Sequence, residues 1–241
     1  MLHQTSGVVL RTIKYGDTSV IVSIYTEKFG IQSYLVNGVR TDKRSGNKAN
    51  LYQPATLLDL IVYHHPYKNL QRIKEARVLH LYQNVQSSMV RNAIAIYMVE
   101  LISKTISEPE CNPELFDFFL QSFIYVDGSP EKNLADFPIQ FTIDHAGHLG
   151  FAIQAPEYND KDCVFDLQNG QFIPLNQLRH THFAEQELAQ GLIDFLLQDA
   201  SLKLNHFKRQ HLLTLLIQYL QLHIPHMREL KSPEVLHAIM A

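Results

Sequence analysis

The chain has 241 residues, of which 46% are hydrophobic and 19% charged, and its formal net charge is −3. This composition supports a folded core and excludes a disordered or collagen-like chain. Two cysteines, Cys111 and Cys163, are too few for a disulfide scaffold or an all-cysteine zinc site. Taken as a whole, the mild negative charge argues against nucleic acid as a partner.

Residues 1–80 have the pattern of a small β-domain. β-Branched and aromatic residues form short runs at 7–10, 19–26, 31–36, 56–63 and 73–79, and turn signals separate them. In the second run Val20, Val22 and Ile24 alternate, which predicts one shared face. Five strands at this spacing predict a small barrel or sandwich.

From residue 81 onward the hydrophobic period becomes helical. We predict helices at 82–106, 114–125, 138–146, 185–199 and 206–224, and a last short helix that starts at Ser232 and Pro233. Asn112, Pro113 and Glu114 form a helix-start signal. The predicted fold class is therefore α+β with two domains, 1–80 and 81–241, the second all-helical apart from an irregular stretch.

The charge is divided unevenly between these two segments. Residues 1–80 hold eleven Lys and Arg against five Asp and Glu, a net charge of +6, whereas residues 81–241 hold ten against nineteen, a net charge of −9. Such asymmetry indicates that the basic part binds a polyanion. The densest basic cluster is a loop between two predicted strands that could fold against phosphates, with a merely solvated loop as the alternative. It consists of Arg40, Lys43, Arg44 and Lys48.

Aromatic residues of the β-domain are candidates for stacking on unpaired bases, although each is more often a core residue. They are Tyr15, Tyr25, Phe29, Tyr34 and Tyr52.

An enzyme is the less favoured interpretation. The thirteen histidines include close pairs, but no His-Glu-x-x-His motif occurs, and Gly147 predicts a turn between His145 and His148. Neither cysteine lies in a nucleophile motif, and no phosphate-binding glycine loop is present. We therefore predict no catalytic residues, no metal and no cofactor.

Several segments resemble the RecO family of bacterial recombination mediators. They read Ser-Gly-Val-Val-Leu at 6–10, Tyr-Gly-Asp-Thr-Ser at 15–19, Thr-Glu-Lys-Phe-Gly at 26–30 and Val-Asn-Gly-Val-Arg at 36–40, and they continue at 51–54 and 70–76. Residues 209–213 and 230–236 are similar to the closing helices of the family. The resemblance implies an oligonucleotide-binding (OB) barrel followed by a helical domain.

The resemblance also implies a function. RecO proteins bind single- and double-stranded DNA, anneal complementary strands, and act with RecR to load RecA onto DNA coated by single-strand-binding protein. The family's DNA-contacting residues correspond first to Arg40, Lys43, Arg44 and Lys48. Weaker candidates in the same domain are Arg11, Lys14, Arg72, Lys74 and Arg77.

Two further expectations concern the second domain. Many RecO proteins carry a four-cysteine zinc module, whereas the corresponding stretch here, within about 140–182, keeps only Cys163, so we expect a degenerate insert without zinc. The resemblance also implies an apolar groove with a basic rim for the acidic tail of single-strand-binding protein. The basic residues that would form this rim are Lys203, Lys208 and Arg209.

The N-terminus has no signal-peptide pattern, and the uncharged stretch 210–227 contains three glutamines, three histidines and a proline. We therefore predict a cytoplasmic, nucleoid-associated protein without membrane contact. Two other functions stay open at this stage: a non-catalytic OB-fold adaptor that binds acidic protein surfaces, and a metal hydrolase.

Overall fold

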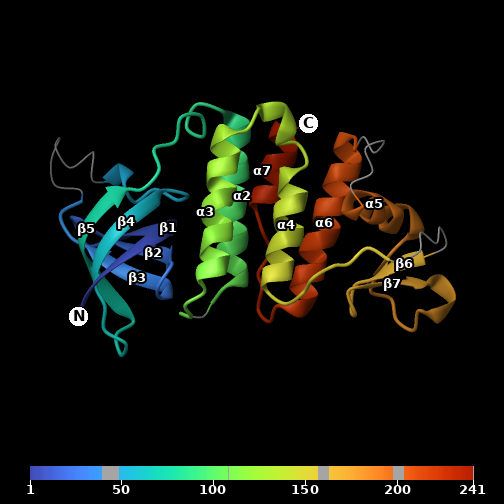
Figure 1. Cartoon of the computed structure of the whole chain (residues 1–241), viewed down its shortest axis with the longest axis horizontal. Helices are drawn as coiled ribbons and strands as arrows, with labels where there is room; N and C mark the ends of the chain where they lie inside the picture. The colour runs from blue at the N-terminus through green and yellow to red at the C-terminus, as the bar shows by residue number, and fades with distance from the viewer. Residues whose placement is uncertain (40–48, 108, 157–162, 198–203, 241) are drawn as a thin grey trace. The chain divides into compact units, whose positions relative to one another are not determined.

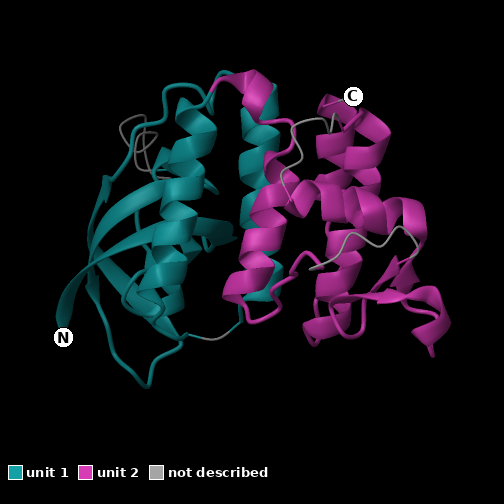
Figure 2. Ribbon diagram, turned by 45° about the vertical axis from the view of Figure 1, so that its right-hand side comes forward, with its two compact units in different colours: residues 1–129 teal, residues 130–241 magenta. Residues whose placement is uncertain are grey.

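The computed structural model describes residues 1–39, 49–107, 109–156, 163–197 and 204–240. The chain forms two compact units, residues 1–129 and 130–241 (Figure 2). The five predicted strands are all present, and they form the barrel of the first unit (Figure 1). They are β1 (Leu2–Tyr15), β2 (Ser19–Thr26), β3 (Gly30–Val36), β4 (Leu57–Tyr63) and β5 (Leu70–Val78).

The barrel is closed in the order β1-β2-β3-β5-β4, and β3 and β5 are its one parallel pair. β1 closes the barrel, because its residues 2–8 pair with β4 and its residues 7–15 pair with β2. A register shift between Val9 and Arg11 bends the strand. Before this shift, Gly7 permits close packing of β1 on β2, since a Cβ there would lie 2.6 Å from Ile24 Cγ2.

Apolar side chains at alternate positions of the strands point inward and fill the barrel core. Val20, Val22 and Ile24 lie in its core, as predicted, together with Tyr34 and Leu60. On the opposite face of β2, Tyr25 is also buried, because its ring meets Phe116 and Phe119 of α3 (Pro113–Gly128) at centroid distances of 6.4 and 5.3 Å. One helix therefore covers part of the outer barrel surface, which explains why both faces of β2 are apolar.

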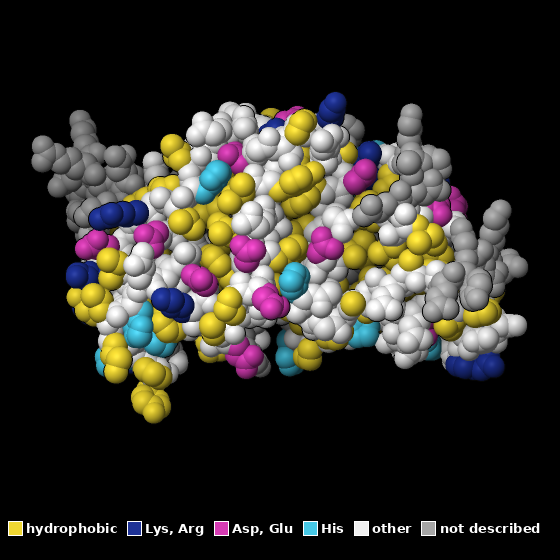
Figure 3. Space-filling model, in the orientation of Figure 1, with side chains coloured by type: hydrophobic (Ala, Val, Ile, Leu, Met, Phe, Trp, Pro, Cys, Tyr) yellow, Lys and Arg dark blue, Asp and Glu magenta, His cyan; other side chains and the backbone are white. Residues whose placement is uncertain are grey.

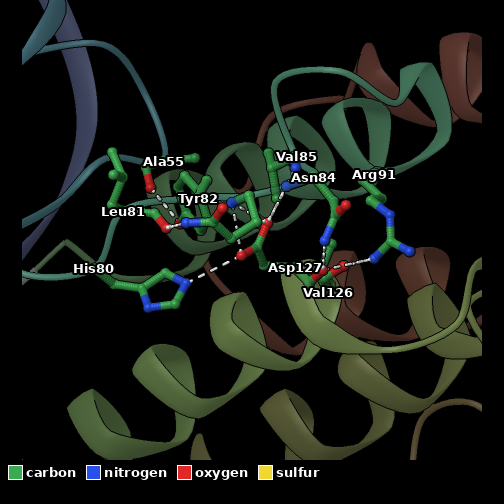
Figure 4. A network of polar contacts seen from close by, with 10 residues as sticks. Ala55, His80, Leu81, Tyr82, Asn84, Val85, Arg91, Val126 and Asp127 are labelled. Atoms are coloured by element: carbon green, nitrogen blue, oxygen red, sulfur yellow. Dashed lines mark hydrogen bonds and ion pairs between the residues drawn. The ribbon is translucent and has the colours of Figure 1, made fainter.

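One buried carboxylate fixes the segment that joins the barrel to the helices. The Asp127 side chain accepts hydrogen bonds of 2.8–3.1 Å from the backbone N–H groups of three successive residues, and His80 Nε2 lies 3.2 Å away (Figure 4). Those residues are Gln83, Asn84 and Val85. Burial alone would raise the pKa of the Asp127 carboxyl, but these hydrogen bonds hold it below its usual value.

The helix predicted at 82–106 consequently begins later, as α2 (Met89–Thr105). Ser88 is its N-cap and accepts a hydrogen bond of 3.3 Å from Arg91 N. The buried Arg91 guanidinium in turn binds the last carbonyls of α3, donating to Val126, Asp127 and Ser129. The predicted start of α3 is confirmed, because Asn112 caps it by accepting from Leu115 N at 3.0 Å.

The second unit combines helices with a small sheet. The helices are α4 (Phe137–His148), α5 (Gln186–Leu196), α6 (His206–His223) and α7 (Ser232–Ile239), with short 3-10 turns η1 (Glu131–Asn133) and η2 (Leu175–Gln177). The strands are β6 (Cys163–Asp166), β7 (Gln171–Pro174) and β8 (Phe183–Ala184), in the order β7-β6-β8.

The α+β class is confirmed, and the second unit is not all-helical, because the stretch expected to be irregular contains the sheet of β6, β7 and β8. The sheet packs on α6, where the rings of Phe165 and Tyr219 lie 5.6 Å apart. Gly170 permits this contact: its φ is +65°, and a Cβ there would lie 2.5 Å from Tyr219 Oη. The domain boundary at residue 80 and the extent of the insert stay predictions.

Among the described residues, no helix is long and apolar enough to cross a membrane.

Candidate nucleic-acid interface

The strongest sequence candidates, Arg40, Lys43, Arg44 and Lys48, lie outside the described residues, as does Lys203. The structure therefore places the weaker candidates on the barrel and the pair Lys208 and Arg209 on α6.

The outer face of β1, β2, β3 and β5 carries two of the barrel candidates. Arg11 is in register with Ser23 of β2, and Arg72 of β5 is in register with Leu35 of β3. Both side chains are exposed, and their strands are not adjacent: β2 and β3 lie between β1 and β5 on one side of the barrel, and β4 lies between them on the other. Lys14 is in register with the core residue Val20, so it belongs to the opposite side of β1, where it is also exposed. Arg11 and Lys14 therefore do not form one cluster.

The charge along β5 is not uniform. At its end, Arg77 lies beside two acids: Arg77 Nη2 is 3.6 Å from Glu75 Oε2, and Asp59 is its partner in register on β4. At its start, Arg72 has Leu35 and Tyr63 as its cross-strand neighbours. On the face of the barrel seen in Figure 3, Lys and Arg side chains lie at separate points rather than in one continuous patch. The positive potential of β5 is therefore concentrated toward Arg72 and Lys74.

The aromatic candidates divide into core and surface residues. Tyr25, Tyr34 and Tyr52 are buried and cannot stack on a base. Phe29 stacks on the His64 ring at a centroid distance of 3.9 Å. Tyr15 is exposed at the end of β1.

Two exposed tyrosines, Tyr63 and Tyr67, were not among the candidates. The sequence His-Pro-Tyr at 65–67 indicates only a turn. The one signal that could have identified Tyr67 as an exposed ring is an aromatic residue within a turn.

The second unit contains a groove of about 540 Å³ between α5 and α6. Phe183, Leu188 and Leu212 contribute apolar surface, Lys208 and His211 contribute basic or polar groups, and Glu185 and Glu187 contribute two carboxylates. Arg209 is the next residue along α6, but it lines a different, smaller crevice with α4 and α7. There its Nε donates to Asp136 Oδ1 at 2.6 Å. The two predicted rim residues therefore face different surfaces, and only Lys208 borders the groove.

The histidines have structural neighbours. His180 Nε2 lies 3.1 Å from the buried Asp166 carboxylate, and His223 Nε2 lies 2.9 Å from the Leu167 carbonyl. The predicted turn at Gly147 is wrong, because α4 continues through it to His148. His145 is fully buried on this helix, and burial, with a smaller effect of His148, lowers its pKa to about 3. No three His, Cys, Asp or Glu side chains in the described ranges are grouped to hold a metal.

A closed five-stranded barrel with this strand order, followed by helices, places the chain in the class of OB-fold proteins, whose barrels commonly bind oligonucleotides or oligosaccharides. Models of the family match most of the chain: "Recombination protein O N terminal" over residues 1–82 and "Recombination protein O C terminal" over residues 86–234. The chain belongs to the RecO family of DNA-repair proteins.

Full-length relatives agree with this assignment. The chain is 32% identical over 244 residues to the DNA repair protein RecO of Azobacteroides pseudotrichonymphae, with 99% of each chain covered. It is 30% identical to the RecO proteins of Christiangramia forsetii, with 99% of each chain covered, and of Bacteroides fragilis, with 98% of each covered.

Proposed function

We propose that this chain is a non-catalytic recombination mediator that binds single- and double-stranded DNA, anneals complementary strands and, with RecR, helps to load RecA onto DNA coated by single-strand-binding protein. It would act in the cytoplasm, on the nucleoid. The observation that carries the proposal is the barrel surface at the start of β5, in a member of a DNA-repair family. No Asp or Glu occurs from Leu60 to Lys74, whereas Lys68, Arg72 and Lys74 are all exposed.

The chemistry required is charge neutralisation rather than bond making. Two DNA strands repel one another through their phosphates, and Lys and Arg side chains displace the counterions that surround each strand. A barrel with exposed cations lowers this repulsion and holds the strands close enough to pair. Because backbone contacts do not depend on base identity, such binding tolerates any sequence.

The salt dependence of binding tests this proposal. For the double variant Arg72→Ala/Lys74→Ala, the slope of log K against log salt for a single-stranded oligonucleotide should fall by about 1.4, since each lost contact removes about 0.7. For the loop variant Lys43→Ala/Arg44→Ala/Lys48→Ala, the same slope should fall by about 2, because three contacts are lost. The rate at which this variant anneals complementary strands at low salt should also fall.

The matched control is Lys132→Ala/Arg228→Ala, which removes two exposed cations from the second unit and should keep the wild-type slope. If the wild-type protein binds no DNA at low ionic strength, the proposal is wrong and the adaptor for acidic protein surfaces takes its place.

We further propose that the groove between α5 and α6 binds the acidic C-terminal tail of single-strand-binding protein, with Lys208 as its basic contact. Lys208→Glu should weaken binding of a synthetic tail peptide at least several-fold, measured by fluorescence anisotropy with the full chain. Arg209→Glu should weaken it less, since Arg209 is already paired with Asp136. Equal affinity of wild type and Lys208→Glu removes this lysine from the site.

A further inference from the structure

Tyr67 projects from the turn between β4 and β5, and 98% of its side chain is exposed. A large aromatic ring in water contributes nothing to the barrel core, whose described members lie elsewhere. No hydrogen bond or ring contact holds the Tyr67 side chain to another described residue. The Tyr67 ring therefore makes no contribution to the stability of the barrel that these contacts account for.

The turn that carries Tyr67 is nevertheless firmly held. The Gln71 side chain is 3% exposed; it accepts from His65 N at 3.0 Å and donates to the carbonyls of His65 and Lys68 at 2.8 and 2.6 Å. Lys68 N also donates to the His65 carbonyl at 3.1 Å, which closes the turn over Pro66. The backbone beneath Tyr67 is thus fixed before any ligand arrives.

The base of the turn is fastened as well. The Met1 ammonium group donates to the His64 carbonyl at 3.1 Å, and His64 N donates to the Met1 carbonyl at 3.0 Å. The His64 ring stacks on Phe29. A ligand that contacts the tip of this turn would order little of the chain, so the entropic cost of binding would be small.

Two exposed cations lie near Tyr67 along the chain, one beside it in the turn and one on the strand that follows. Lys68 follows Tyr67 directly and is exposed. Arg72 is in register with Tyr63, whose side chain is 47% exposed, and Leu2 flanks Tyr63 on the other side. The surface thus places aromatic rings next to positive charges, the combination by which proteins hold single strands: cations contact phosphates while rings stack on bases.

We propose that Tyr67 is a stacking platform for an unpaired base of single-stranded DNA. This inference rests on the proposed function and adds a specific ligand, because in a duplex both faces of each base are already covered by its neighbours. Lys68 and Arg72 neutralise the phosphates on either side of the stacked base. Double-stranded DNA uses the cations of this surface but not the ring.

Three DNAs of equal length separate these contributions: oligo-dT, the same backbone with abasic sites, and a blunt duplex. Tyr67→Ala should weaken oligo-dT binding by about 5- to 150-fold, the range for loss of one aromatic–base stack. Its affinity for the abasic strand and the duplex should change less than twofold. Tyr67→Phe should restore wild-type affinity, since the ring and not the hydroxyl makes the contact.

The absence of tryptophan from the chain provides a second readout. Tyr67→Trp introduces a single tryptophan, and its fluorescence should be quenched by oligo-dT but not by the abasic strand. Tyr125→Trp is the matched control, because Tyr125 is 45% exposed on α3. Its fluorescence should respond equally little to both strands.

The inference is wrong if Tyr67→Ala binds oligo-dT as tightly as wild type does, or if it loses affinity equally for all three DNAs. The second result would instead indicate a disturbed turn. If the wild-type protein binds none of the three, the proposed function fails and the stacking assignment fails with it. Wild-type binding together with an unaffected Tyr67→Ala leaves the proposed function intact and removes only the stacking role.

Discussion

Each unit contains a buried carboxylate that accepts hydrogen bonds from backbone N–H groups, but the two differ in how far along the chain their donors lie. Asp127 accepts from backbone N–H groups 42–44 residues earlier, whereas Asp166 accepts from Gln168 N and Asn169 N, two and three residues later. Each also faces a histidine, His80 or His180, at 3.2 or 3.1 Å. Asp127 therefore fixes a connection between elements, while Asp166 shapes a single local turn.

The cost of removing a buried carboxylate depends on whether its hydrogen-bond donors can find another acceptor. The donors of Asp166 belong to exposed residues of its own turn, which water can reach. One donor of Asp127 belongs to the buried Val85, and the others hold the start of a linker. A buried donor left without an acceptor costs about 1–3 kcal/mol, so the two sites should differ in energy.

The largest expected effect is that of Asp127→Ala. It leaves three backbone N–H groups and the linker without their common acceptor, so the free energy of unfolding should fall by about 3–5 kcal/mol. Urea denaturation measures this loss. The control is Asp117→Ala, which removes an exposed carboxylate from the same helix and should change stability by less than about 0.5 kcal/mol. Equal losses for the two variants would remove Asp127 from its linking role.

The second largest effect should be a loss of stability in acid, caused by His145 in the second unit. His145 has a folded pKa of about 3 against an ordinary value of 6.5. Between these values the unfolded chain binds a proton that the folded chain does not, so the second unit loses stability as pH falls. The loss should reach about 2 kcal/mol at pH 5. His145→Gln should flatten the pH profile of unfolding, while His148→Gln, at an exposed site, should leave it nearly unchanged.

The carboxylates respond at lower pH. The pKa of Asp127 and that of Asp166 are both held below the usual 3.8 by hydrogen bonds that outweigh the effect of burial. Their stabilisation is complete above the unfolded pKa and is lost as pH falls through the folded value. Between pH 5 and 7 these two groups should therefore contribute a constant amount, and the acid sensitivity in that range should come from histidine.

The third prediction is that Asp166→Ala costs about 1–2 kcal/mol, less than Asp127→Ala, because its freed donors can bind water. Hydrogen exchange should show increased exchange confined to the turn after β6 and to the segment around His180. If exchange increases throughout the second unit, Asp166 supports more than its own turn, and the contrast with Asp127 disappears.

The smallest effect should come from the histidine partners. His80→Gln and His180→Gln remove one contact from each carboxylate but leave the backbone donors in place. Each should cost about 0.5–1 kcal/mol near neutral pH. A loss from His80→Gln as large as that from Asp127→Ala would show that the His80 contact, and not the backbone donors, accounts for the stabilisation by Asp127.

Local patterns predicted the barrel well because its strands alternate and its turns carry clear signals. The same reasoning placed the start of α2 at residue 82 instead of Met89, since the acceptor that binds Gln83, Asn84 and Val85 is Asp127, more than forty residues away in sequence. The small sheet was missed for a related reason: β6 and β7 have only four residues each, and β6 is buried throughout, so no alternation marks it.

The candidate site was only partly predictable. Composition located a basic barrel, but it could not show that Arg77 is offset by Glu75 while Arg72 is not. Helical spacing could not show that Arg209 points to Asp136 and Lys208 to a groove. Tyr67 is visible in the sequence only as a turn residue, because exposure depends on what else packs against the turn.

The closure of the barrel has a consequence for how a partner can be recognised. Since β1 pairs with both β2 and β4, and β3 pairs with β5, every strand of the barrel has two neighbours and none ends the sheet. Along the lengths that are paired on both sides, a partner cannot extend the sheet with a strand of its own, because those ladder positions are already in use. Recognition is left to side chains and connecting turns, so specificity and affinity can change through point substitutions without any change in the scaffold.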